Sequence, residues 1–233
     1  MNFISRLQGV FFNPKQTFTA LSKKPIWLDA LLIILIAFAI FSYLAAPYQR
    51  QDSIRIWEDS TKLKERMGEE AYKERIEQIK NPSQLQKILG IVLAPIGFTI
   101  GLLISSLIIF FMGRIISLEG KYVHVFSALV HANFIDKLLG NALRIVLIFG
   151  KKSVMQTTTS LAIFFPTLDY TSQAYIILSQ FDFFQLWLFG ILGFGLSAIF
   201  KISLKRALFI SYGFWLIKSL LNIAMWWISM RFV

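Results

Sequence analysis

The chain has 233 residues, of which 56 % are hydrophobic, and its 24 Lys/Arg against 13 Asp/Glu give a formal net charge of +11. Cysteine is absent, which excludes disulfides, thiol nucleophiles and cysteine-ligated zinc or iron–sulfur clusters. The positive charge does not indicate nucleic-acid binding, because the basic residues gather at the ends of apolar stretches, where they meet lipid headgroups.

Residues 1–25 carry two short amphipathic helical patterns. Asn13 is a candidate N-cap for the second pattern, Pro14 suits the first helical position, and Pro25 ends the helix. We expect an interfacial amphipathic segment that anchors the first span, with docking to a partner as the alternative. The apolar run that follows is too long for a signal-peptide core, so it is expected to remain as a span.

Five apolar stretches are each close to the length of about 20 residues that crosses a bilayer as a helix. They cover residues 26–46, 88–116, 122–149, 183–200 and 207–230. One soluble core cannot bury five such helices. The predicted fold class is therefore all-α: a polytopic membrane helix bundle with five transmembrane spans over residues 26–233, preceded by the amphipathic segment 1–25.

The segment 48–87 differs from its surroundings, with nine Lys/Arg and eight Asp/Glu. Mixed charge at helical spacing predicts a solvated helical excursion between the first two spans. Ser83 and Gln86 form a capping-box pattern that opens the second span. Basic residues in the remaining loops favour a cytoplasmic N-terminus, so five spans place the C-terminus outside the plasma (inner) membrane.

Two spans carry small residues at a spacing that lets helix backbones approach closely. Gly97 and Gly101 form a G-x-x-x-G pair in the second span, and Gly190, Gly193 and Gly195 lie in the fourth. Packing within the chain and packing between subunits both fit this pattern.

The third span is unusually polar for a transmembrane segment. Its candidate functional residues are His131, Asp136, Asn141 and Arg144, and the last span adds Lys218 and Asn222. A buried charge needs a counter-ion, so we predict that Asp136 pairs with Lys218 and that the third and fifth spans are neighbours.

We predict no direct pairing of Asp136 with the other charges near it. Arg144 is eight residues away and is predicted to be too distant, and Lys137 should point about 100° away around the helix. The polar residues fit either a proton or ion path or a broken, shallow helix facing its neighbours. Lys218 could alternatively meet a substrate carboxylate or a lipid phosphate. His124 and His131 share a helix face, which is a weak metal signal without further ligands.

No metalloprotease, nucleophile-elbow or phosphate-loop motif occurs in the sequence. We therefore predict that the protein is not an enzyme, and we assign no catalytic, cofactor-binding or metal-binding residue.

Three stretches, in this order around five spans, carry a family resemblance. They are Asn13-Pro14-Lys15-Gln16-Thr17-Phe18 with Lys24-Pro25-Ile26-Trp27, then Gly120-Lys121-Tyr122, then Asp182-Phe183-Phe184-Gln185-Leu186-Trp187. The chain resembles the Yip (Ypt-interacting protein) domain family, in its compact prokaryotic form. The motif residues that we single out are Asn13, Pro14, Pro25, Asp182 and Trp187; physically, Asp182 can cap a helix and Trp187 can anchor at the interface.

The resemblance implies five spans, a cytoplasmic N-terminus and a scaffold or accessory role, sometimes beside ABC-type exporters. Eukaryotic relatives act with small GTPases, but their D-L-Y-G-P-type segment has no counterpart here. The predicted function is a non-catalytic accessory subunit whose partners are the lipid bilayer and other membrane proteins, including transporter subunits or a second copy of itself. The alternative is a small transporter or lipid-moving protein that uses the polar third span.

Overall fold

The computed structural model describes residues 1–59, 64–65, 67–155 and 158–232. The structure is 83 % helical, and the described residues form no β-strand beyond one isolated bridge between Ser160 and Asp182. The predicted all-α class is confirmed.

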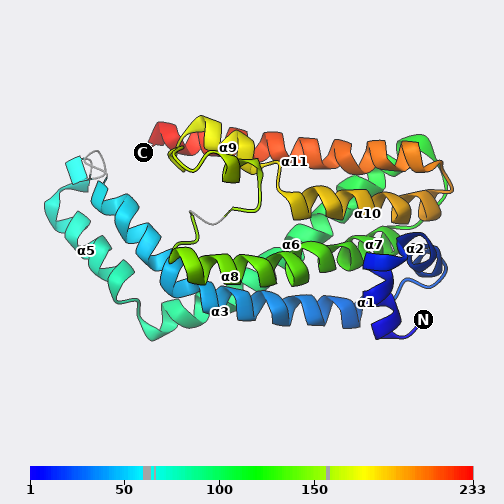
Figure 1. Ribbon diagram of the computed structural model, residues 1–233, viewed down its shortest axis with the longest axis horizontal. Coiled ribbons are helices and arrows are strands. Elements are labelled where there is room, and N and C mark those ends of the chain that lie inside the picture. The colour runs from blue at the N-terminus through cyan, green and yellow to red at the C-terminus, as the bar shows by residue number, and fades with distance from the viewer. Residues whose placement is uncertain (60–63, 66, 156–157, 233) are drawn as a thin grey trace.

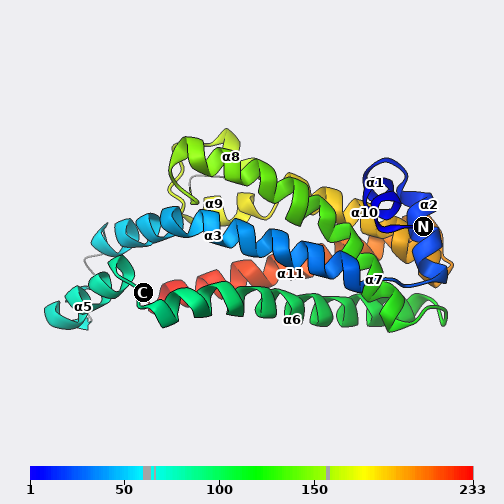
Figure 2. The same ribbon diagram turned by 90° about the horizontal axis from the view of Figure 1, so that it is seen from below.

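Four of the described helices are long and apolar enough to cross a membrane. They are α3 (Leu28–Asp59), α6 (Gln84–Ile116), α10 (Phe183–Phe200) and α11 (Leu204–Phe232). The remaining predicted span is present as α7 (Tyr122–Asn133), the π-helical segment η1 (Phe134–Gly140) and α8 (Asn141–Lys151), which follow one another without interruption. The five passes run side by side (Figures 1 and 2), and the two chain termini lie at opposite ends of the bundle, as an odd number of passes requires.

The first pass is longer than predicted. Helix α3 continues through Pro47 to Asp59, and its 32 residues make it about 48 Å long, against about 30 Å for the hydrocarbon layer. Its last turns therefore belong to the charged excursion. Helix α5 (Glu69–Lys80) folds back beside them, with the Tyr72 hydroxyl donating to the carbonyl of Trp57 at 2.7 Å. The predicted capping box of Ser83 and Gln86 then starts α6.

Helices α1 (Phe3–Phe12) and α2 (Pro14–Lys23) pack onto the end of the bundle formed by α7 and α10 (Figure 1). Phe18 of α2 is 1 % exposed and lies against Gly195. Pro14 is at the start of α2, but the side chain of Asn13 donates to Gln16 at 2.8 Å instead of capping the helix backbone. The location of residues 1–25 at the membrane surface remains a prediction.

Two connections flank the third pass. Gly120 precedes α7 with a φ of +87°, and a Cβ atom there would lie 2.8 Å from Ile199, so both backbone conformation and space favour glycine. At the other end of the bundle, residues 158–182 contain a 3₁₀ turn, η2 (Leu161–Phe164), and the short helix α9 (Gln173–Ser179), before Asp182 starts α10.

Candidate functional site: a buried ion-pair network in the third span

Asp136 lies in the π-helical segment η1, between the α-helical halves of the third pass. Its side chain is only 1 % exposed. A π-helical turn carries one residue more than an α-helical turn, and such insertions occur frequently at functional sites. The segment therefore changes which side chains share a face along this helix.

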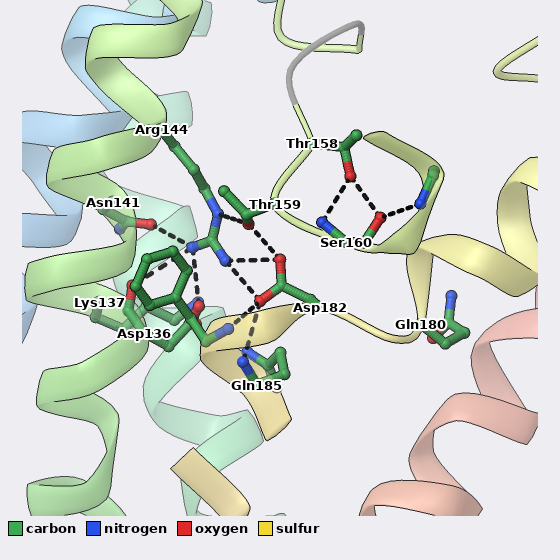
Figure 3. A network of polar contacts seen from close by, with 12 residues as sticks. Asp136, Lys137, Asn141, Arg144, Thr158, Thr159, Ser160, Gln180, Asp182 and Gln185 are labelled. Carbon is green, nitrogen blue, oxygen red and sulfur yellow. Dashed lines mark hydrogen bonds and ion pairs between the residues drawn. The ribbon is translucent and has the colours of Figure 1, made fainter. Parts of the chain in front are cut away.

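The carboxylate of Asp136 contacts two cations from its own pass. Its Oδ2 lies 2.6 Å from Lys137 Nζ, and its Oδ1 lies 2.8 Å from Arg144 Nη1 (Figure 3). The predicted pairing of Asp136 with Lys218 is wrong. The expectations that Arg144 is too distant and that Lys137 points away are wrong as well.

The π insertion explains the error for Arg144. Eight residues of regular α-helix advance by about 800° and leave two side chains about 80° apart. With one π residue inserted, the same eight advance like seven, by about 700°, which leaves them about 20° apart. Helical side chains also tilt toward the N-terminus, so the long Arg144 side chain reaches back toward Asp136.

Arg144 extends the network to the fourth pass. Its Nη2 lies 3.1 Å from both carboxylate oxygens of Asp182, and its Nη1 donates to Oδ1 of Asn141 at 3.1 Å. The guanidinium also lies 5.5 Å from the ring centroid of Phe184. Arg144 is thus held between two anions and an aromatic face, an arrangement suited to its planar, delocalised charge.

Asp182 joins three structural elements. Its Oδ1 accepts hydrogen bonds from the backbone N–H groups of Phe184 at 2.9 Å and Gln185 at 3.0 Å, so it caps α10 as expected. Its Oδ2 accepts from the Thr159 hydroxyl, which in turn accepts from Arg144 Nε at 3.3 Å. The network connects the third pass, the loop that precedes α10, and the start of α10.

Lys137 and Lys218 line a small cavity of about 230 Å³ between the passes. Lys137 Nζ lies 5.4 Å from the ring centroid of Phe98, while Lys218 Nζ donates to Gln185 Oε1 at 3.2 Å. Asn222 donates to Gln180 Oε1 at 3.3 Å, one turn further along α11. Lys218 therefore binds a neutral side chain of the fourth pass, and it does not contact Asp136.

His131 belongs to a second polar cluster, at the N-terminal end of the bundle. Its Nδ1 lies 2.8 Å from the carbonyl oxygen of Ser127, which can only accept, so Nδ1 carries the proton. Its Nε2 then accepts from Nε of Arg6 at 3.2 Å, which makes the imidazole neutral. Arg6, 3 % exposed, forms an ion pair with Asp29 at the start of α3.

The chemistry of the two clusters suits a structural role. The charges of Asp136, Asp182, Lys137 and Arg144 cancel, and a neutralised set of this kind can hold helices in register inside a membrane. Among the described residues, no group of three or more His, Asp or Glu side chains could hold a metal ion.

The remaining sequence-predicted residues separate into packed and open positions. A Cβ on Gly193 would lie 2.5 Å from Leu208, and one on Gly195 would lie 2.9 Å from Phe18, so both glycines permit close helix contacts. At Gly190 a Cβ would lie 3.0 Å from the Tyr212 hydroxyl. At Gly97 and Gly101 no described atom lies within 4 Å of a Cβ position, and Gly101 lines the small cavity beside Lys137 and Lys218.

Sequence reasoning missed several members of these clusters. Arg6 had a usable signal, because it is a cation in an otherwise apolar N-terminal helix, and Asp29 is an acid in the first turn of a span. Thr159 and Gln185 had no such signal, because their partners come from other elements.

A bundle of long apolar helices with paired charges inside defines a multi-pass membrane protein. The model of the Yip1 domain family matches residues 9–225, and the chain belongs to this family. Its members are not known as enzymes. No curated protein and no solved structure gives a match.

Proposed function

We propose that the protein is a non-catalytic scaffold or accessory subunit that binds other membrane proteins. The observation that carries this proposal is the open glycine face of α6. An ABC-type exporter is the partner class that we would test first, because the family resemblance points to it.

Helix α6 is far less covered by its own chain than α10. In an apolar 18-residue window of each helix, 6 % of the α6 window is buried, against 56 % of the α10 window. Leu208 and Phe18 occupy the space beside Gly193 and Gly195 of α10, whereas no described atom lies within 4 Å of a Cβ position on Gly97 or Gly101. A G-x-x-x-G pair allows another transmembrane helix to approach closely, so the open face of α6 suits a helix from a partner protein.

The charged excursion supports the same role. None of the residues of α5 is buried, and the helix touches the end of α3 away from the five-pass bundle (Figure 2). It therefore offers a second, water-exposed surface to a partner.

The test replaces Gly97 and Gly101 together with leucine. No described atom lies within 4 Å of a Cβ at either position, so the protein should fold and elute normally while crosslinked partners are lost. Gly150→Leu is the matched control, since its Cβ position on α8 is equally open. Recovery of the wild type only as an isolated monomer, or retention of partners by the double variant, would refute the proposal.

The small cavity beside Lys137 and Lys218 favours a second candidate function, a transporter or lipid-moving protein. The cavity reaches Lys218, but Asp136 is not among its lining residues. If Lys218→Ala leaves flux in reconstituted vesicles unchanged, this candidate fails.

We further propose that the protein lies in the plasma (inner) membrane with a cytoplasmic N-terminus. The charge distribution supports this orientation. Because the chain has no cysteine, single cysteines can be placed at the exposed positions Glu70 and Lys205. Position 70 should react with an impermeant maleimide in intact cells, and position 205 only after permeabilisation; the reverse pattern would invert the topology.

A further inference from the structure

A cavity of about 860 Å³ lies where α3, α5 and α6 meet, at the end of the bundle away from α1 and α2. It is separate from the ion-pair network and from the small cavity beside Lys218. Three cations line it, one from each helix: Arg50, Arg75 and Lys87. No aspartate or glutamate is among its lining residues.

Two of these cations have no partner among the described residues. Arg50 and Lys87 form neither an ion pair nor a side-chain hydrogen bond with any residue that the structure describes. Arg75 is held in place: its guanidinium lies 5.9 Å from the Trp57 ring centroid, and its Nη1 donates to Gln78 at 3.3 Å. The nearby acid Glu58 is paired with Lys80 at 3.3 Å. The positive charge of the cavity is therefore not neutralised by its own walls.

The other part of the cavity wall is mostly apolar. Gly90 and Ala94 of α6 and Phe149 of α8 line it, together with Leu44 of α3. These residues lie in the apolar stretches predicted to span the membrane, whereas Arg50 and Arg75 lie in the charged excursion. No described neighbour lies within 4 Å of a Cβ position on Gly90, so there is space along this part of α6.

The cavity thus has a cationic end and an apolar end, and it lies where the membrane-spanning part of the bundle meets the excursion. A phosphate needs cationic donors, and an acyl chain needs an apolar groove. We propose that this cavity binds an anionic phospholipid, with the phosphate held by Arg50, Arg75 and Lys87 and an acyl chain along Gly90 and Ala94. Clustered cations at a membrane boundary attract anionic headgroups, and three helices converging on one concave site add selectivity to that attraction.

The test is native mass spectrometry of the full-length protein in mild detergent, titrated with phosphatidylglycerol or with zwitterionic phosphatidylcholine. Phosphatidylglycerol should remain bound and phosphatidylcholine should not. The double variant R50Q/K87Q should weaken phosphatidylglycerol binding by roughly five-fold for each cation removed. The matched control K205Q/R206Q removes two exposed cations at the opposite end of the bundle and should bind like the wild type. Equal losses in both variants, or no loss in R50Q/K87Q, would overturn the proposal.

A second pair of measurements separates a lipid from a free phosphate. Gly90→Phe fills the apolar end and leaves all three cations in the chain, and it should also reduce phosphatidylglycerol binding while normal elution shows that the protein is folded. Inorganic phosphate and glycerol phosphate should compete only weakly. If Gly90→Phe binds phosphatidylglycerol like the wild type, or if inorganic phosphate competes as strongly as the lipid, the lipid assignment fails.

Discussion

Replacing Arg144 with methionine is the sharpest perturbation of the ion-pair network. It removes the cation that contacts both Asp136, at 2.8 Å, and Asp182, at 3.1 Å. On insertion scales, an arginine at the centre of a membrane helix costs about 2.5–3.5 kcal/mol, so its removal alone should favour the membrane-embedded state. A loss of stability in Arg144→Met can therefore come only from the contacts of Arg144 in the folded bundle.

The size of this loss of stability follows from the contacts that Asp136 and Asp182 keep. Breaking a buried pair by removing one partner costs about 3–5 kcal/mol. Asp136 would keep Lys137 at 2.6 Å, and Asp182 would keep two backbone donors and Thr159, which places the loss near the low end of that range. The lost contact with Phe184 adds about 0.5–1 kcal/mol. We expect Arg144→Met to lower the free energy of unfolding by about 3.5–4 kcal/mol.

The assay is unfolding in mixed micelles, monitored by tryptophan fluorescence, with the fraction of monodisperse protein as a second readout. Asp136→Asn added to Arg144→Met should recover about 1–3 kcal/mol relative to the sum of the two single losses, because residues in one ion-pair network couple. Arg206→Met, at an exposed position of α11, is the control for losing an arginine. Wild-type stability in Arg144→Met, or strictly additive losses in the double variant, would refute the reasoning.

Three further outcomes follow from the contacts described above. Lys218→Met should lose less than about 1.5 kcal/mol in the same unfolding assay, because only a hydrogen bond to a neutral side chain is removed, and Asp136→Asn should not rescue it; a loss as large as that of Arg144→Met would contradict this. Arg6→Met should free residues 1–25 for limited proteolysis, because it breaks contacts with His131 and Asp29, and an unchanged digestion pattern would show that the apolar contacts alone hold the segment. Gly195→Leu should lose about 1–3 kcal/mol through overpacking against Phe18, whereas a similar loss for Gly97→Leu would show that α6 is packed after all.

The parts of this structure that depend on local spacing could be predicted from the sequence. The capping box of Ser83 and Gln86 and the cap at Asp182 connect residues three positions apart or fewer, and both form as expected. The apolar stretches likewise gave the five passes, because about 20 residues suffice to cross a bilayer.

The partners of the buried charges could not be predicted in this way. The Arg144–Asp136 contact depends on the π insertion of η1, and no residue pattern marked that insertion in the sequence. The contact of Arg6 with His131 joins residues 125 positions apart, so no local rule could connect them. The sequence identified Asp136 as a buried charge but not Arg6, and the geometry of the bundle decided how both pair.

The position of α2 has a consequence for how the protein is made. Helix α2 packs on α10, which is synthesised roughly 160 residues later, and translation at about 5–20 residues per second makes that delay roughly 10–30 s. During this time, Phe18 and its apolar neighbours have no docking surface on α10. The N-terminal segment is thus synthesised first but reaches its final position late. Its apolar face is buried only when α10 has been made and the bundle has assembled.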